Sequence, residues 1–235
     1  MKSYNDIGIS SELDRGRIAH LLKLGILAAL MGLAADFVLG WGTTDNSLSG
    51  MEQYFSRYLA VSEGRVICSA ILGLIGIPLE CLCYFGIYRL IASKSQKLAH
   101  TYRSGLIGML AFGAFTHVMC CAVIFYLKSI YAVDPAAAID GTVRFAMWFL
   151  LPVTILFLPF FITAAVTQFI AFVKGFTPYP KWCCIFSILS GIPVVIIAKL
   201  FGDLPLVNAI STGWISWGGL ITFGGLLIAM KKADM

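Results

Sequence analysis

The chain has 235 residues, of which 59% are hydrophobic and only 12% are charged. A soluble domain carries about 25% charged residues, so this chain has too few to cover a globular surface in water. The composition therefore excludes an ordinary soluble domain and favours lipid as the solvent. The net charge of +5 does not indicate nucleic-acid binding, because the basic residues lie between apolar stretches, where they set membrane topology.

Six apolar stretches are long enough to cross a bilayer, which takes about 20 residues of α-helix. No linker divides them, so we expect one all-α membrane domain over residues 1–235, a bundle of six transmembrane helices. The first stretch follows a polar leader and is longer than the core of a signal peptide, so we interpret it as an uncleaved helix. The stretches are residues 18–41, 66–91, 104–127, 143–173, 182–201 and 205–230.

Lysine and arginine residues predict the orientation of the bundle. With the N-terminus inside, 12 of the 17 fall on the inner side and 5 on the outer side. Since short cytoplasmic loops are enriched in these residues, we expect both termini in the cytoplasm of a multi-pass cell-membrane protein. The inner set is Lys2, Arg15, Arg17, Lys23, Arg89, Lys94, Lys97, Arg103, Lys174, Lys181, Lys231 and Lys232.

The outer loops carry signals for short helices. Ser49 and Glu52 have the spacing of a capping box and precede an apolar stripe, which predicts an amphipathic helix on the outer surface. Asp134–Pro135 is typical of an N-cap and first helical residue, and Asp203–Pro205 predicts a similar start for the last span. The stripe consists of Met51, Tyr54, Phe55, Tyr58 and Leu59.

Glu80 and His117 are the candidate functional groups inside the spans. At 1.5 Å per residue they lie about 16 Å and 20 Å from the inner ends of the second and third spans. Ionisable groups in a span usually face the bundle interior or a water-filled cavity. A neighbouring carboxylate and imidazole share protons, which suits proton coupling, acid–base chemistry or binding of a polar ligand. The alternatives are a structural hydrogen bond and two groups that never meet.

A second polar group is expected near the outer surface. Asp36 lies close to the outer end of the first span, Arg144 opens the fourth, and Asn208 and Ser211 lie on one face of the last. These residues predict a polar vestibule above Glu80 and His117, with Trp214 in its wall. The alternative is that they are wet, charge-paired interface residues and an aromatic belt.

The sequence favours neither a metal nor another cofactor. Four of the seven cysteines lie within a turn of Glu80 or His117, but Cys81 and Cys83 are two residues apart and point to different helix faces. Known catalytic motifs of hydrolases, metalloproteases and nucleotide-binding proteins are absent from the sequence. Glycine-rich faces, as in the pair Ala28 and Gly32, predict close helix packing within the chain or in an oligomer.

The overall plan resembles a known kind of protein. Six spans, the single His117 in the third, and the stretch Asn208-Ala-Ile-Ser-Thr-Gly-Trp214 in the last resemble uncharacterised families of six-helix bacterial membrane proteins. The resemblance covers nearly the whole chain. It implies the six-helix architecture and brings no activity.

Three kinds of function remain open. The favoured one is a small transporter or ligand-binding membrane protein, with Glu80 and His117 at the midplane and Asp36, Arg144 and Asn208 at the mouth of an outward-facing cavity. The second is a membrane-embedded enzyme acting on a lipid or isoprenoid, with His117 or Glu80 as acid–base. The third is an accessory subunit of a membrane complex. The expected partners are the lipid bilayer and a small-molecule or lipid ligand, without nucleic acid.

Overall fold

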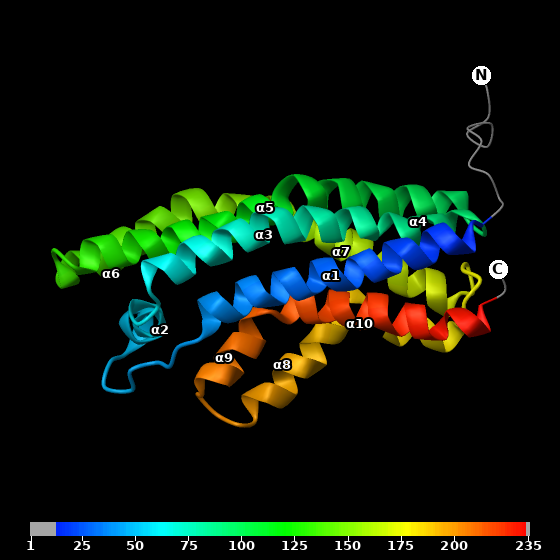
Figure 1. Cartoon of the computed structure of the whole chain (residues 1–235). Coiled ribbons are helices and arrows are strands. Elements are labelled where there is room, and N and C mark those ends of the chain that lie inside the picture. Colours follow the sequence, from blue (N-terminus) through cyan, green and yellow to red (C-terminus); the bar gives the residue numbers. More distant parts are fainter. Residues whose placement is uncertain (1–12, 234–235) are drawn as a thin grey trace, which may run out of the picture.

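A computed structural model describes residues 13–233 and consists of helices joined by short turns (Figure 1). Within this range, five helical segments are long and apolar enough to cross a membrane. The chain is therefore a multi-pass membrane protein. The five segments are Arg15–Gly40, Glu63–Ala92, Gln96–Tyr131, Pro135–Val173 and Trp214–Lys232.

The long helices lie side by side in a bundle (Figure 1). Helix α3 (Glu63–Cys83) packs between α1 (Arg15–Gly40) and α5 (Gln96–Tyr131). Helix α7 (Leu151–Val173) packs on α5, and α10 (Trp214–Ala229) packs on α1. Small residues permit this close approach in lipid, where apolar surface alone does not drive helices together.

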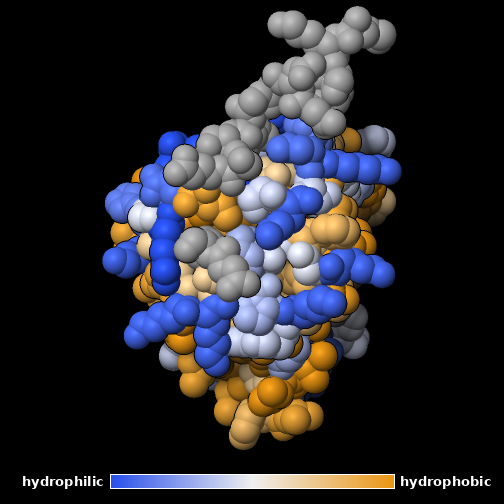
Figure 2. Space-filling model, turned by 90° about the vertical axis from the view of Figure 1, so that its right-hand side faces the viewer, coloured by the Kyte–Doolittle hydropathy of each residue, from blue (hydrophilic) through white to orange (hydrophobic). Residues whose placement is uncertain are grey.

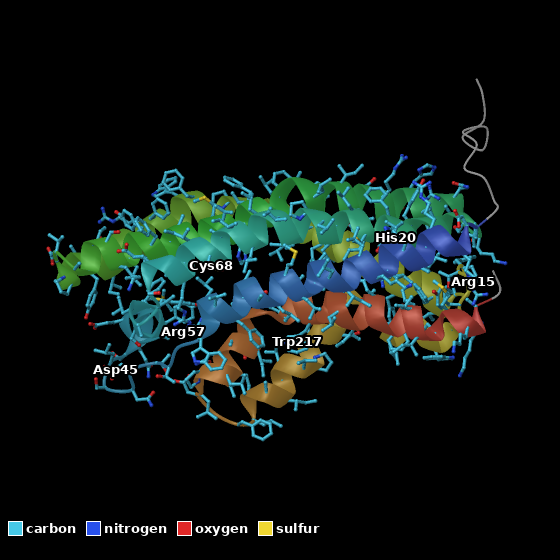
Figure 3. The ribbon with its side chains drawn as sticks, in the orientation of Figure 1. Arg15, His20, Asp45, Arg57, Cys68 and Trp217 are labelled. Atoms are coloured by element: carbon cyan, nitrogen blue, oxygen red, sulfur yellow. The ribbon has the colours of Figure 1, made fainter. Side chains whose placement is uncertain are left out.

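Both described ends of the chain lie at one end of the bundle. The guanidinium of Arg15 donates to the carbonyl of Met230 at 3.2 Å, which joins the start of α1 to the end of α10. Figure 2 looks onto this end and shows hydrophilic side chains gathered there. Figure 3 shows Arg15 at this end and Asp45 and Arg57 at the opposite one. Lys2, part of the predicted inner set, lies outside the described residues.

The stretch 182–201 is not the continuous helix that we expected. It forms two 3₁₀ turns, Lys181–Ile185 and Ile188–Ser190, followed by the short helix α8 (Gly191–Lys199). Ser187 and Ser190 form a capping box, which satisfies backbone groups locally and begins a new helical turn there.

The last predicted span is also divided. Gly213 separates α9 (Pro205–Thr212) from α10. Ahead of the break, the hydroxyls of Ser211 and Thr212 donate to the carbonyls of Val207 and Asn208. Such back-bonding competes with the helical ladder and bends helices.

The fourth predicted span begins earlier than expected and changes pitch. Helix α6 (Pro135–Phe145) runs through a π-helical turn, Ala146–Leu150, into α7. Pro152 at the start of α7 has no N–H for the preceding turn, which accounts for the wider pitch there. The start of α6 is as predicted, because Asp134 accepts from the backbone N–H of Ala137 at 3.0 Å.

The predicted outer helix is present as α2 (Gly50–Leu59). Phe55 and Tyr58 are buried, whereas Met51 and Tyr54 at the other edge of the stripe are exposed. The predicted capping box is wrong, because the Ser49 side chain makes no cap hydrogen bond.

Leu204, not Asp203, occupies the N-cap position of α9, because the Asp203 carboxylate accepts from Thr44 and Asn208. Helix α4 (Phe85–Ala92) follows α3 after a break at Tyr84.

Gly105 and Gly224 provide a matched test of this packing. A Cβ at Gly105 would lie 2.7 Å from the backbone nitrogen of Ala164, whereas nothing lies within 4 Å of one at Gly224. We expect Gly105→Ala to destabilise the α5–α7 contact by about 1–3 kcal/mol through overpacking. Gly224→Ala should leave stability unchanged or raise it by up to about 1 kcal/mol through helix propensity. Thermal unfolding in detergent measures both, and equal effects would contradict the packing.

Candidate functional site

The candidate site is a cavity of about 430 Å³ inside the bundle, between α1, α3, α5, α7 and α10. Most of its wall is apolar. Two carboxyl groups and one imidazole face it, Asp36 from α1, Glu80 from α3 and His117 from α5. Three helices thus bring together groups that are distant in the sequence.

Asp36 and His117 form the closest charged pair in the cavity. The Nδ1 atom of His117 lies 3.7 Å from Oδ1 of Asp36, and the two side chains are only 11% and 14% exposed. Ser216 of α10 donates to the other carboxyl oxygen of Asp36 at 2.9 Å. Gly73 makes room for the imidazole, because a Cβ there would overlap its ring.

Ser69 determines which nitrogen of His117 carries a proton. The Nε2 atom lies 3.1 Å from the Ser69 carbonyl oxygen and 3.2 Å from its hydroxyl. A carbonyl oxygen only accepts, so an attractive contact requires the hydrogen on Nε2. Attraction between Nδ1 and Asp36 then requires one further proton, on either the imidazole or the carboxyl. In that state the pair carries no net charge.

Glu80 is the third of these groups and has fewer partners. Its side chain is buried, with the residue 5% exposed, and the Tyr84 hydroxyl donates to Oε1 at 3.4 Å. Throughout residues 13–233, Oε2 of Glu80 has no hydrogen-bond partner. Gly219 of α10 makes room for this carboxyl, since a Cβ there would overlap it. This acceptor is open to the cavity, where a proton or a ligand can bond to it.

The expected meeting of Glu80 and His117 takes a different form in the structure. Both side chains line the same cavity, but the carboxylate paired with His117 is Asp36. Sequence analysis placed Asp36 at the mouth of the site. Its only special signal was a charge within an apolar run. Ser69 and Ser216 were missed, because a lone serine in a span is common and back-bonds to its own helix.

Asn208 lies in a separate network at the end of the bundle opposite the described termini. Its side-chain N–H groups donate to the Gly42 carbonyl at 2.8 Å and to Asp203, and Lys199 donates to its oxygen at 2.9 Å. Thr44 also donates to Asp203, from its backbone N–H at 2.8 Å. We call these five residues the hairpin clasp, because they tie the α8–α9 turn to the end of α1.

Asp203 has an altered pKa within the hairpin clasp. Partial burial alone would raise the pKa of this carboxyl. Hydrogen bonds from Thr44 and Asn208, with the charge of Lys199, outweigh that effect and hold its pKa below the usual value. The clasp is therefore complete while Asp203 is ionised.

The remaining predicted residues are spread over the bundle. Arg144 forms an exposed ion pair with Asp140 at 3.0 Å, away from the Asp36 pair. The Ser211 hydroxyl donates to Val207 within its own helix at 2.7 Å. Trp214 lines the cavity and packs edge-on against Phe161, with 5.4 Å between ring centroids. Among residues 13–233, no group of three or more His, Cys, Asp or Glu side chains is arranged to hold a metal.

One comparison identifies the family. The model of a family of unknown function (DUF6796) matches residues 1–233. The chain belongs to this family. No curated protein and no solved structure matches the chain. Family membership brings no activity, so function has to be argued from the cavity.

Asn208 and Ser211 provide a matched test of the hairpin clasp. Asn208→Ala leaves the Gly42 carbonyl and the Lys199 ammonium without their partner, and such losses cost about 1–3 kcal/mol. Ser211→Ala removes a bond within one helix and should change stability little. Thermal unfolding and hydrogen exchange over residues 200–213 report the difference. Equal protection in the two variants would show that the clasp does not hold the turn.

Proposed function

We propose that the protein is a six-span transporter of the cell membrane that binds a small molecule in the Asp36–Glu80–His117 cavity and exchanges protons there. The supporting observation is an apolar cavity with two carboxyl groups and one imidazole, and with an unsatisfied carboxyl oxygen. Ionisable groups inside a membrane are costly and mark substrate or proton pathways.

The path of the chain supports six crossings. Helices α7 and α10 both end near the start of α1 (Figure 1). The residues that connect the end of α7 to the start of α10 therefore cross back to the opposite end of the bundle. The two 3₁₀ turns and α8 make this return, and α9 leads into α10. Interrupted helices that line a site are characteristic of transporters. The basic residues at the shared end favour a cytoplasmic location for both termini.

Ser69, His117 and Asp36 also favour binding over hydrolysis. Their order resembles the nucleophile, base and acid of a hydrolase. However, Ser69 is 0% exposed, and His117 donates to its carbonyl. A nucleophile must reach the substrate, which this hydroxyl does not do. The open Oε2 of Glu80 likewise argues against an accessory subunit with purely structural polar contacts.

A lipid-soluble carbodiimide tests whether the cavity carboxyls hold protons and are reachable. Dicyclohexylcarbodiimide adds to a protonated carboxyl and rearranges to a stable N-acylurea, with no leaving group. We expect mass spectrometry to find this adduct on Glu80 and Asp36 in membranes, with less at high pH because carboxylates do not react. Glu80→Gln and Asp36→Asn should each remove one adduct. A protein that stays unlabelled at both positions would contradict the proposal.

A thermal-shift screen tests ligand binding itself. Small cations, anions and neutral amphiphiles are added to the detergent-purified protein, and a ligand of the cavity raises the unfolding temperature. We expect such compounds to act on the wild type and the control Asp140→Asn, whose carboxyl lies in the exposed ion pair. Glu80→Gln and Asp36→Asn should lose the shift. Failure of every compound to distinguish the wild type from both cavity variants would contradict a binding function.

A further inference from the structure

The geometry points to a lipophilic monocation as the ligand of this cavity, a molecule that replaces a proton at Glu80 and enters from the lipid beside α7. This inference rests on the proposed function and adds the chemical class and route of the ligand. It follows from the charge, wall and opening of the cavity.

The charge of the cavity selects against anions. Its lining includes Asp36 and Glu80 but neither lysine nor arginine among the described residues. Two basic side chains that contact α1 and α9 are engaged in other hydrogen bonds. Arg65 donates to the carbonyls of Val38 and Trp41 at 2.9 Å and 3.0 Å, and Lys199 donates to Asn208. A phosphate or carboxylate would therefore meet the Glu80 carboxylate with no lysine or arginine to compensate the repulsion.

The number of uncompensated charges favours one positive charge on the ligand. Asp36 and His117 balance each other once one proton is shared, and Ser216 donates a hydrogen bond to Asp36. Glu80 is left with one hydrogen bond, from Tyr84. A proton or a monocation neutralises it, but both together would restore a net charge. Binding of the cation and of the proton is therefore mutually exclusive, which is the basis of exchange.

The walls select an apolar cation. Tyr84, Phe157 and Trp214 present aromatic side chains to the cavity, and most of the other lining residues are apolar. Aromatic faces attract cations most strongly when water is excluded. A hydrated metal or a polyamine would lose water without equivalent polar partners. A cavity of about 430 Å³ has the size for one drug-sized organic molecule.

Entry beside α7 is inferred from Leu158, the one residue of the cavity lining that is exposed. Leu158 lines the cavity, is 41% exposed, and belongs to the exposed stripe Leu151, Ile155, Leu158 and Ile162. The turn Lys181–Ile185 packs on α7 and the turn Ile188–Ser190 packs on α10, so the irregular segment fills the space between these helices toward the inner end. The cavity lies on the other side of this irregular segment, toward the opposite end of the bundle. We infer that molecules dissolved in the lipid reach it there.

Tetraphenylphosphonium and tetraphenylborate form a matched test, because they share a shape and differ in the sign of charge. We expect tetraphenylphosphonium to bind saturably to the purified wild type in equilibrium dialysis and tetraphenylborate to bind at least ten-fold more weakly. Tetraphenylphosphonium carries no proton of its own. Its binding in weak buffer should therefore release a proton, measured with a pH indicator.

Glu80→Gln keeps the shape of the side chain and removes its charge. We expect at least ten-fold weaker tetraphenylphosphonium binding and no proton release, while Asp140→Asn matches the wild type. Thr154→Trp narrows the cavity from α7 without changing charge and should also abolish binding, which keeps the test decisive if Glu80→Gln fails to fold.

The outcomes separate this inference from the proposed function. Equal or tighter binding of tetraphenylborate, or undiminished cation binding to Glu80→Gln, overturns the monocation class. Carbodiimide labelling of Glu80 would then still support a proton-exchanging cavity. Absence of both cation binding and carbodiimide labelling overturns the two proposals together.

Discussion

Polar groups inside a bundle in lipid depend on partners from neighbouring helices, and this constraint organises the molecule. Asp36 meets it through His117 and Ser216, and His117 meets it through Asp36 and Ser69. Glu80 meets it only in part, through Tyr84. Asp36 and Glu80 each accept one hydrogen bond, but only Asp36 has an ionic partner among the described residues, so Glu80 is the carboxyl more open to a proton or a cation.

Regular and irregular parts of the fold have different roles around the cavity. The continuous helices α1, α3 and α5 supply its two carboxyl groups and one imidazole and hold them at fixed depths. The segment from residue 181 to 213 is broken into turns and short helices, and the hairpin clasp ties its outer turn to α1. Contacts of side chains, rather than a continuous backbone ladder, therefore position the segment that packs beside α7 and α10.

Opposite charges are separated along the bundle for related physical reasons. Basic side chains gather at one end, where water and lipid headgroups solvate them and where they bias orientation (Figure 2). Acidic side chains occupy the interior cavity, where no basic residue among those described compensates Glu80. The first arrangement is the basis of the predicted orientation, and the second is the basis of the proposed binding of protons and cations.

The sequence by itself determined the helical membrane class, most helix positions and the start of α6 at Asp134, because hydrophobicity and capping are local properties. It also singled out Glu80, His117 and Asp36, since charge in an apolar run is visible without a structure. Only the tertiary structure decided that Asp36, not Glu80, pairs with His117, and that Ser69 and Ser216 complete the pair. It also decided the breaks at Ser187 and Gly213 and the place of Asn208 in the hairpin clasp. Those features depend on which helix faces meet and at what depth, and the packing of residues distant in the sequence sets both.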